Sequence, residues 1–474
     1  MSDSRTVPAD TSTEALGGPA TETAATGPTA ETAATGPTST GGAGGLRARL
    51  LAGFGDPVLR ILATATMVST LGRGVFFTLT VLYFTTVVGL SAGQVAVVLS
   101  VASGVGVGTS LLGGQLADRL SARYLLVVLT VAEGVALVAY TAATSFAAVL
   151  ALACVVTGAG SASHSVRSAI IARAFDGAAR VGARAVLRTV TNVGIALGSA
   201  GGGLALLAGT GTAYRVTMVA AGVAYVLSAL PLPRLPRRVD APPRGAAPRR
   251  SGGRAAEAAA VPGRSPFRDA RYLLLTVLSG AFSMQFALAE VGLPLWVSDH
   301  TVAPTVVVAI AFILNTVIVV AFQIRLSRGT DDVGHAGRVI ALAGVLMLAA
   351  TVAYAGSADV GAGAAVVLVL GAMTAHSFAE VLSSAGTWGL SFELAEPARA
   401  GAYQGLFAMG YNVGAMAAPV VVTATALTHG WWGWLALGVL FLVAALGMWW
   451  IARRATGPAA PAGRRPHRRE RRRR

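Results

Sequence analysis

The sequence has no lysine, a single cysteine and few charged residues, which make up 12% of its 474 positions. The single cysteine, Cys154, excludes an intramolecular disulfide bond and a zinc cluster. Soluble domains carry about 25% charged residues. The low charged fraction and the 54% of hydrophobic residues therefore exclude an ordinary soluble domain and predict a protein that crosses a membrane several times.

Motifs for chemistry are also missing. The sequence contains no nucleotide-binding loop, no cluster of metal ligands and no nucleophile motif. We therefore expect neither an enzyme nor a bound cofactor or metal. If the protein moves a solute, an existing gradient must drive the movement.

Long apolar runs dominate what is present. A bilayer core about 30 Å thick needs about 20 apolar residues per helix. On that measure the sequence predicts twelve transmembrane helices, near 60–84, 92–115, 124–143, 147–171, 185–208, 214–233, 271–297, 304–326, 338–355, 362–389, 401–427 and 431–452.

These runs divide the chain into five parts and predict an all-α membrane protein. We expect two six-helix bundles, at 46–233 and 267–455, joined by a basic, proline-rich cytoplasmic linker at 234–266. Residues 1–45 contain a near-repeat rich in Thr, Ala, Gly and Pro, which has little to bury and is expected to be disordered. The arginine-rich tail at 456–474 is also expected to be disordered and to contact anionic lipid.

The arginines fix the expected orientation. A net charge of +16 at pH 7 can indicate nucleic-acid binding. Here, however, the arginines lie in the loops on one side of the spans, so they indicate topology and no nucleic-acid partner. Arginine-rich loops stay in the cytoplasm. We therefore expect a multi-pass protein of the cell membrane with both termini in the cytoplasm.

The loop after the second predicted span carries a motif, GGQLADRLSARYLLVV, at 113–128. It resembles the loop Gly-x-Leu-Ala-Asp-Arg-x-Gly-Arg-Arg-x-x-Leu of the major facilitator superfamily. Ser121 and Ala122 depart from this pattern. The resemblance implies two six-helix bundles that alternate access to a central site. It also implies a conformational latch, in which the aspartate contacts the start of the eleventh helix, just after Arg399. The residues assigned to the latch are Gly114, Asp118, Arg119 and Arg123.

A second resemblance lies in the fifth predicted span. Gly194, Gly198, Gly202 and Gly203 resemble an antiporter signature in which a proline stands at the position of Ser199. Glycines three or four residues apart make a flat helix face for close packing. Packing of small residues without any antiporter role is the alternative interpretation.

Ionisable residues inside the predicted spans are the candidates for proton coupling. The tenth span, AHSFAEVLSSAGTWGLSFELAE, resembles that of a branch of drug:proton antiporters with an intramembrane glutamate, here Glu380. A low dielectric raises the pKa of a carboxyl group, so such a residue can exchange a proton. The other candidates are His376 on the same helix face, Glu290 and Arg73. The fourth span has Cys154 where the resemblance implies an arginine, and Arg73 is the candidate that replaces its charge.

Polar and aromatic residues at membrane depth are the candidates for the substrate cavity: Gln285, Asn315, Gln323, Phe76 and Phe286. Two other intramembrane residues, Glu133 and His164, are interpreted as helix-packing groups. Aromatic residues on such helices also serve as packing or interfacial anchors, so this assignment remains open.

Together these features predict a proton-coupled secondary transporter that exports small lipophilic compounds by alternating access. Its expected partners are the substrate, protons and the lipid bilayer, and we expect a monomer. The first alternative is an importer or facilitator of a small organic solute, for which Arg73 keeps an anionic substrate open. The second, a membrane enzyme or sensor, lacks a catalytic set and an ordered output domain in the sequence.

Overall fold

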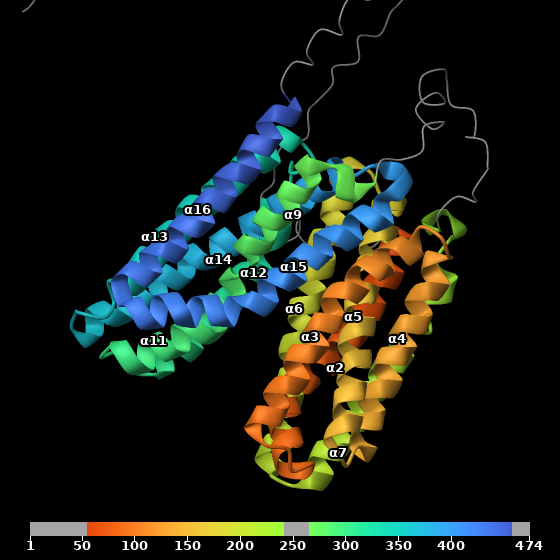
Figure 1. Ribbon diagram of the computed structural model, residues 1–474, viewed down its shortest axis with the longest axis horizontal. Helices are drawn as coiled ribbons and strands as arrows, with labels where there is room; N and C mark the ends of the chain where they lie inside the picture. The colour runs from red at the N-terminus through yellow and green to blue at the C-terminus, as the bar shows by residue number, and fades with distance from the viewer. Residues whose placement is uncertain (1–54, 241–264, 457–474) are drawn as a thin grey trace, which may run out of the picture. The chain divides into compact units, whose positions relative to one another are not determined.

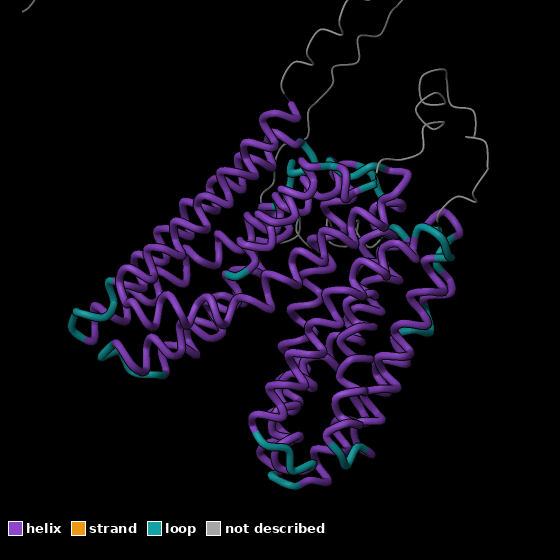
Figure 2. The backbone as a smooth tube through the Cα atoms, in the orientation of Figure 1, coloured by secondary structure: helices purple, strands orange, loops and turns teal. Residues whose placement is uncertain are grey.

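The computed structural model describes residues 55–240 and 265–456, and all regular structure in these two ranges is helical (Figure 2). Every described residue belongs to one compact unit, Leu50–Arg474. The disordered segment predicted at 1–45, all but the first residue of the one predicted at 456–474, and most of the predicted linker lie outside the described residues.

Six long helices make up the first described range, and we call them the N-terminal set: α2 (Pro57–Leu82), α3 (Ala92–Ala117), α4 (Ala122–Ala139), α5 (Phe146–Ala174), α6 (Gly177–Ala208) and α7 (Gly211–Ser228). Short turns extend two of them, η1 (Tyr83–Val87) after α2 and η2 (Tyr140–Ala142) after α4. Helix α2 packs against α6 and α7, and α5 packs between α3 and α4 (Figure 1).

The second range holds the C-terminal set: α9 (Ala270–Ser283), α10 (Gln285–Ala287), η6 (Leu288–Gly292), α11 (Leu293–His300), α12 (Val306–Leu326), α13 (Val333–Ala355), α14 (Ala362–Glu393), α15 (Ala400–Val422), η8 (Thr423–Leu427) and α16 (Thr428–Thr456). The turns η5 (Pro266–Arg268) and η7 (Pro397–Arg399) precede α9 and α15. Helix α13 packs against both α14 and α16 (Figure 1).

Side-chain caps explain where several helices begin. The Asp56 carboxylate accepts the backbone N–H of Val58 at 2.7 Å, and Pro57 occupies the first helical position of α2. Ser91 and Gln94 form a reciprocal capping box at the start of α3. Caps of this kind satisfy N–H groups that have no partner inside the helix. They place the polar helix ends outside the apolar runs.

Within the described residues, eleven helical segments are long and apolar enough to cross a membrane. The last two predicted spans, 401–427 and 431–452, lie together in one helical segment of 60 residues, Pro397–Thr456. Gly430 interrupts that segment with φ 54° and ψ −128°. Residues with a side chain rarely adopt such a conformation, so the glycine allows the chain to change direction there.

The beginning of the predicted linker is folded in the structure. Residues 232–240 form two short turns, η3 (Leu232–Arg234) and η4 (Arg237–Val239), and Val239 is fully buried. Asp240 accepts a hydrogen bond from the Ser121 hydroxyl at 2.8 Å and pairs with Arg123 at 3.3 Å. The apolar side chain and the ion pair therefore hold this part of the linker against α4 and α5.

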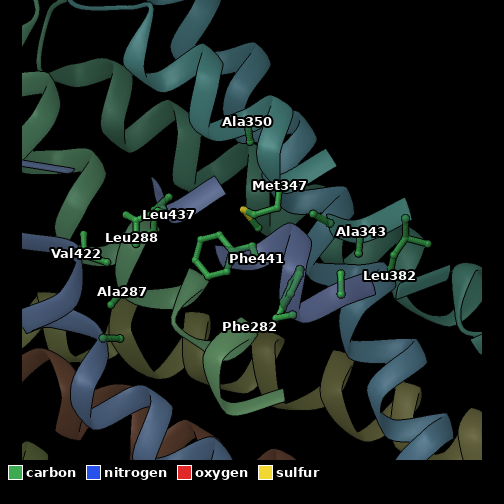
Figure 3. Packing of buried hydrophobic residues seen from close by; sticks show 14 of the residues in the cluster. Phe282, Ala287, Leu288, Ala343, Met347, Ala350, Leu382, Val422, Leu437 and Phe441 are labelled. Atoms are coloured by element: carbon green, nitrogen blue, oxygen red, sulfur yellow. The ribbon is translucent and has the colours of Figure 1, made fainter. Parts of the chain in front are cut away.

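The two sets bury their apolar residues differently. The C-terminal set has one large cluster that includes Phe282, Met347, Leu437 and Phe441 (Figure 3). The N-terminal set has two clusters. One surrounds Leu62, Leu126 and Val166, and the other surrounds Leu79, Tyr83, Tyr140 and Val149. Polar residues of α2, α4 and α5 lie between these two clusters in the sequence of each helix, and they form the site described next.

Candidate functional site

A polar layer crosses the N-terminal set between its two apolar clusters. Arg73 of α2 pairs with Glu133 of α4, with Nη2 and Oε1 separated by 3.3 Å. Its Nε also donates to the Tyr225 hydroxyl of α7 at 3.2 Å. The Glu133 side chain is 6% exposed and that of Arg73 is 37% exposed. The sequence interpretation of Glu133 as a packing group therefore omits its main contact, an ion pair with Arg73.

Helix α5 adds a histidine and an arginine to this layer. Gly160, His164 and Arg167 are four and three residues apart and so share one helix face. A Cβ on Gly160 would lie 3.0 Å from the Glu133 carboxylate and 3.5 Å from Arg73, so the glycine leaves room for the ion pair. The Nε of Arg167 is buried without a hydrogen-bond partner.

Arg184 of α6 contacts the same face of α5. Its guanidinium donates to the Ser168 hydroxyl at 3.2 Å and lies 2.8 Å from Nε2 of His164. Because a guanidinium is only a donor, Nε2 of His164 must accept, which places the imidazole proton on Nδ1. Arg184 is 8% exposed. The sequence analysis assigned no site role to Arg184 or Arg167.

One ion pair joins the two sets at the middle of the site. Arg188 of α6 donates to Oε1 of Glu380 on α14 in a very short contact. The second carboxylate oxygen of Glu380 accepts from Asn315 of α12 at 3.0 Å, and Asn315 also donates to Ser377 at 3.0 Å. Glu380 is 7% exposed. The structure thus brings together two predicted residues, Glu380 and Asn315, with a third that the sequence analysis missed.

Aromatic rings surround the guanidinium groups of α6. The Arg188 guanidinium lies 5.6 Å from the ring centre of Phe286 and 5.4 Å from that of Trp388. Arg184 lies 4.8 Å from the Trp388 ring. Phe286 and Tyr411 are in contact, with ring centres 6.1 Å apart. Such contacts stabilise a cation beside an apolar surface, so the group is both charged and aromatic.

The remaining predicted cavity and coupling residues do not join this group. Gln285 donates to Ser383, and Gln323 donates to Ser327 one turn further along its own helix. Phe76 stacks on Tyr140 within the N-terminal set. His376 is 1% exposed, with its ring centre 6.3 Å from that of Tyr354. Glu290 is exposed on the turn η6.

Asp118, at the end of α3, contacts the start of α15. Its carboxylate accepts the backbone N–H of Gly401 at 2.8 Å and of Ala402 at 2.7 Å. Arg119 and Arg123, which we assigned to the latch, do not pair with this carboxylate. Arg173 of α5 pairs with Asp118 at 2.5 Å, whereas Arg123 pairs with Asp240. Arg119 is exposed.

Glycines allow α3 and α15 to meet at their backbones. A Cβ on Gly114 would lie 2.1 Å from the carbonyl oxygen of Gly401, and one on Gly401 would lie 2.3 Å from the carbonyl oxygen of Gly114. Real Cβ atoms do not approach other atoms so closely. Neither residue can carry a side chain while this contact exists.

The glycine face of α6 packs on α2. A Cβ on Gly194, Gly198 or Gly202 would collide with α2, the closest approach being 2.0 Å at each of the first two. Gly203 is not part of this face, because nothing lies within 4 Å of its Cβ position. Ser199, at the position of the expected proline, donates to the carbonyl of Gly74 at 3.2 Å. This face joins two helices of one set.

The polar contacts that join the two sets lie in one half of the helices. They run from Asp118 and the Arg180–Glu393 pair, at 2.9 Å, to the Arg188–Glu380 pair and Asn412, which donates to Gly106 at 3.4 Å. These contacts belong to the described residues, 55–240 and 265–456. In the same ranges, no group of three metal-ligand side chains could hold a metal ion.

An all-helical chain with apolar spans and a charged site between two helix sets is a membrane transport protein in architecture. The sequence model of the Major Facilitator Superfamily matches residues 62–388, and the chain belongs to that family. It is therefore a multi-pass membrane protein of a family of secondary transporters. No curated protein matches the chain.

Solved structures with the same fold have distant sequences. The human organic anion transporter MFSD10 (TETRAN) is 16% identical, with a TM-score of 0.62 over 83% of this chain and 99% of its own. The proton:xylose symporter XylE, bound to 6-bromo-6-deoxy-D-glucose, is 13% identical, with a TM-score of 0.61 over 84% and 95%. A bacterial homologue of the iron transporter ferroportin, in an outward-facing state, is 13% identical, with a TM-score of 0.61 over 84% and 98%.

Proposed function

We propose that the protein is a proton-coupled transporter of the cell membrane that exports small lipophilic compounds by alternating access, as in the drug:proton antiporter branch. Both termini lie in the cytoplasm in this proposal, and the chain crosses the membrane twelve times as a monomer. The 60-residue segment Pro397–Thr456 supports the twelfth span, since at 1.5 Å per residue it is about 90 Å long, three times the bilayer core.

The observation that carries the proposal is the Arg188–Glu380 ion pair. Its two side chains come from different helix sets, and Glu380 is nearly enclosed. An enclosed carboxylate is stable as an anion only while it is paired. Protonation of Glu380 removes its charge, and with it the attraction that joins α6 to α14. A proton can therefore change the relative stability of the two access states.

Exchange requires that proton and substrate use this pair alternately. A ligand lodged between Phe286, Trp388 and Tyr411 would contact the Arg188 guanidinium and disturb its bond to Glu380. The aromatic rings favour a ligand with apolar surface. Ligand binding and protonation of Glu380 then both weaken the Arg188–Glu380 contact. This shared contact is a simple basis for moving ligand and proton in opposite directions.

The contacts at Asp118 support an outward-facing state in this proposal. The arginine-rich helix ends are taken as cytoplasmic, and Asp118 and Arg180 bridge the two sets at those ends. Closing the cytoplasmic side leaves access from the outside, where protons are plentiful. Protonation of Glu380 from that side fits an export cycle.

A second candidate is an importer or facilitator of a small organic anion. The observation that favours it is the excess of arginine in the site: Arg73, Arg167, Arg184 and Arg188 face only two paired carboxylates, Glu133 and Glu380. The direction of proton flow separates the candidates. Export by exchange moves protons inward as substrate leaves, whereas a facilitator moves its solute without a pH gradient.

The test combines a growth panel with reconstituted protein. Toxic compounds are screened in a host that lacks its own efflux pumps, and those that the protein makes tolerable are added to proteoliposomes containing a pH-sensitive dye. We expect compound-dependent proton movement by the wild type and none by Glu380→Gln. Asp359→Asn, which removes an exposed carboxylate, is the matched control and should behave like the wild type. Unchanged proton movement by Glu380→Gln overturns the proposed coupling.

A further inference from the structure

Two arginines of the site lack a carboxylate partner. Arg73 is paired with Glu133, and Arg188 with Glu380. In the described part of the chain no ion pair joins Arg167 or Arg184 to any acidic side chain. Glu290, the other acidic residue near Glu380, also forms no ion pair there. The site therefore contains two guanidinium groups without an ion-pair partner of their own, and the carboxylate that acts on Arg167 from a distance, Glu133, is already paired with Arg73.

The depth of these arginines makes the imbalance costly. Arg184 lies seven residues after the start of α6, and Arg167 seven residues before the end of α5. At 1.5 Å per residue each is about 10 Å inside its helix. An arginine inside a membrane span is costly to insert, and a buried charge is normally paired. Two arginines without an ion-pair partner in this part of the site favour the binding of an anion that is not part of the protein.

The geometry of the group points toward a small ligand. Arg167 and His164 share a face of α5, and Arg184 reaches that face from α6 to within 2.8 Å of the imidazole. The Nε of Arg167 is enclosed with its donor unused. His164 is exposed although it contacts the enclosed Arg184. The exposed His164 therefore offers its Nδ1–H on an open side, next to Arg184, which donates to its Nε2, and on the same helix face as Arg167.

We propose that Arg167 and Arg184, with His164, form a subsite for the carboxylate of the transported compound. This rests on the proposed transport function and specifies its substrate as an organic acid with an apolar body. The carboxylate accepts from the two guanidinium groups, whose forked donors suit its two oxygens. The apolar body lies toward Trp388, the ring that already covers Arg184.

Equilibrium binding tests this subsite without transport. Purified protein in detergent is titrated with a panel of aromatic and aliphatic carboxylates and with the primary amide of each, and the thermal midpoint is followed. A ligand that binds the folded state raises the midpoint. We expect carboxylates with an aromatic body to stabilise the protein and their amides to have little effect. A panel in which no carboxylate stabilises the protein more than its amide overturns the proposal.

Variants locate the effect. Arg184→Gln and Arg167→Gln should each weaken carboxylate binding by about tenfold or more, since each removes a hydrogen bond to a charged group. Arg184→Lys should retain part of the affinity because it keeps the charge. Arg215→Gln removes an exposed arginine outside the site and should bind like the wild type. Equal weakening for carboxylate and amide would overturn the assignment.

The two proposals fail separately. Loss of carboxylate binding in the arginine variants, with no proton movement in proteoliposomes, would leave the subsite standing and remove proton-coupled export. Proton movement with neutral compounds and unchanged binding in Arg184→Gln and Arg167→Gln would do the reverse. If Arg184→Gln does not fold, Arg167→Gln and Arg184→Lys still decide the matter.

Discussion

The site contains two Arg–Glu pairs at membrane depth, and they differ in which helices they join. Arg73–Glu133 joins α2 to α4 within the N-terminal set, and Tyr225 of the same set supports it. Arg188–Glu380 joins the N-terminal set to the C-terminal set. If the two sets move as bodies, the first pair is carried along intact, whereas the second must lengthen or break. The same chemistry therefore has a structural role in one place and a role in switching in the other.

The cores of the two sets support this distinction. The N-terminal set has a polar layer between two apolar clusters, and the Arg73–Glu133 pair is what fills part of that layer. The C-terminal set has one continuous apolar cluster, and Glu380 accepts a hydrogen bond from Asn315 of its own set while its ionic partner, Arg188, comes from the other set. Glu380 can therefore change partners without disturbing the packing beneath it.

The largest expected effect comes from neutralising both partners of the pair between the sets. One proton, at a membrane potential of about 100 mV and a gradient of one pH unit, provides about 3.7 kcal/mol, which sustains a substrate gradient of about 500-fold. Arg188→Gln with Glu380→Gln removes the proton site, so we expect a folded protein with no uphill transport. The measurement is the steady-state ratio of substrate across proteoliposomes. Recovery of a gradient in the double variant would show that the pair is structural.

For the pair within the N-terminal set, we expect the single substitution to be harmful and the double substitution to be tolerated. Arg73→Leu leaves the Glu133 carboxylate enclosed and unpaired, which we expect to lower the stability by about 1–3 kcal/mol. Arg73→Leu with Glu133→Leu removes both charges and should restore most of the thermal midpoint in detergent. Arg73→Lys should keep part of the activity if charge matters more than shape. Full activity in Arg73→Ala would remove Arg73 from any transport role.

The smallest expected effect concerns Asp118. A carboxylate at a helix N-terminus contributes about 0.3–1 kcal/mol, so Asp118→Asn should change the ratio of the two access states by about two- to fivefold and leave substrate affinity nearly unchanged. Electron–electron distances between spin labels at Arg237→Cys and Arg328→Cys, in a Cys154→Ala background, report that ratio. Asp359→Asn is the control, because it removes an exposed carboxylate away from both labels. Identical distance distributions would exclude a latch.

Much of the fold could be predicted from the sequence because a membrane span needs a long apolar run, which the sequence shows directly. Apolar runs of sufficient length gave the helices, and the motif around Asp118 gave the family. Glu380 was also visible, since a carboxylate in an apolar run has few neutral explanations. The ends of the helices could be predicted less well. The span predicted at 185–208 begins at Gly177 in the structure, because arginines there were assigned to a loop.

That shift explains the missed residues. The predicted span, 185–208, left Arg184 outside its start and gave Arg188 no role. In the structure Arg188 is eleven residues inside α6, about 16 Å from its start. The signal was their spacing: Arg180, Arg184 and Arg188 repeat every four residues, which puts them on one helix face rather than in a loop. Arg167 lay within a predicted span, where an isolated charge is itself a signal. Which acid each arginine meets depends on tertiary packing, which no local pattern contains.

The contact between Gly114 and Gly401 has a consequence for how the molecule changes state. Where a side chain lies between two helices, the helices can slide while that side chain changes rotamer, and the contact is lost gradually. Here the carbonyl oxygen of each glycine occupies the place where the other would carry a Cβ, so no side chain lies between the two backbones. The contact between α3 and α15 is therefore either fully formed or absent, and we expect two discrete populations of molecules. A single-molecule distance trace should show abrupt jumps between two distances with no intermediate plateau.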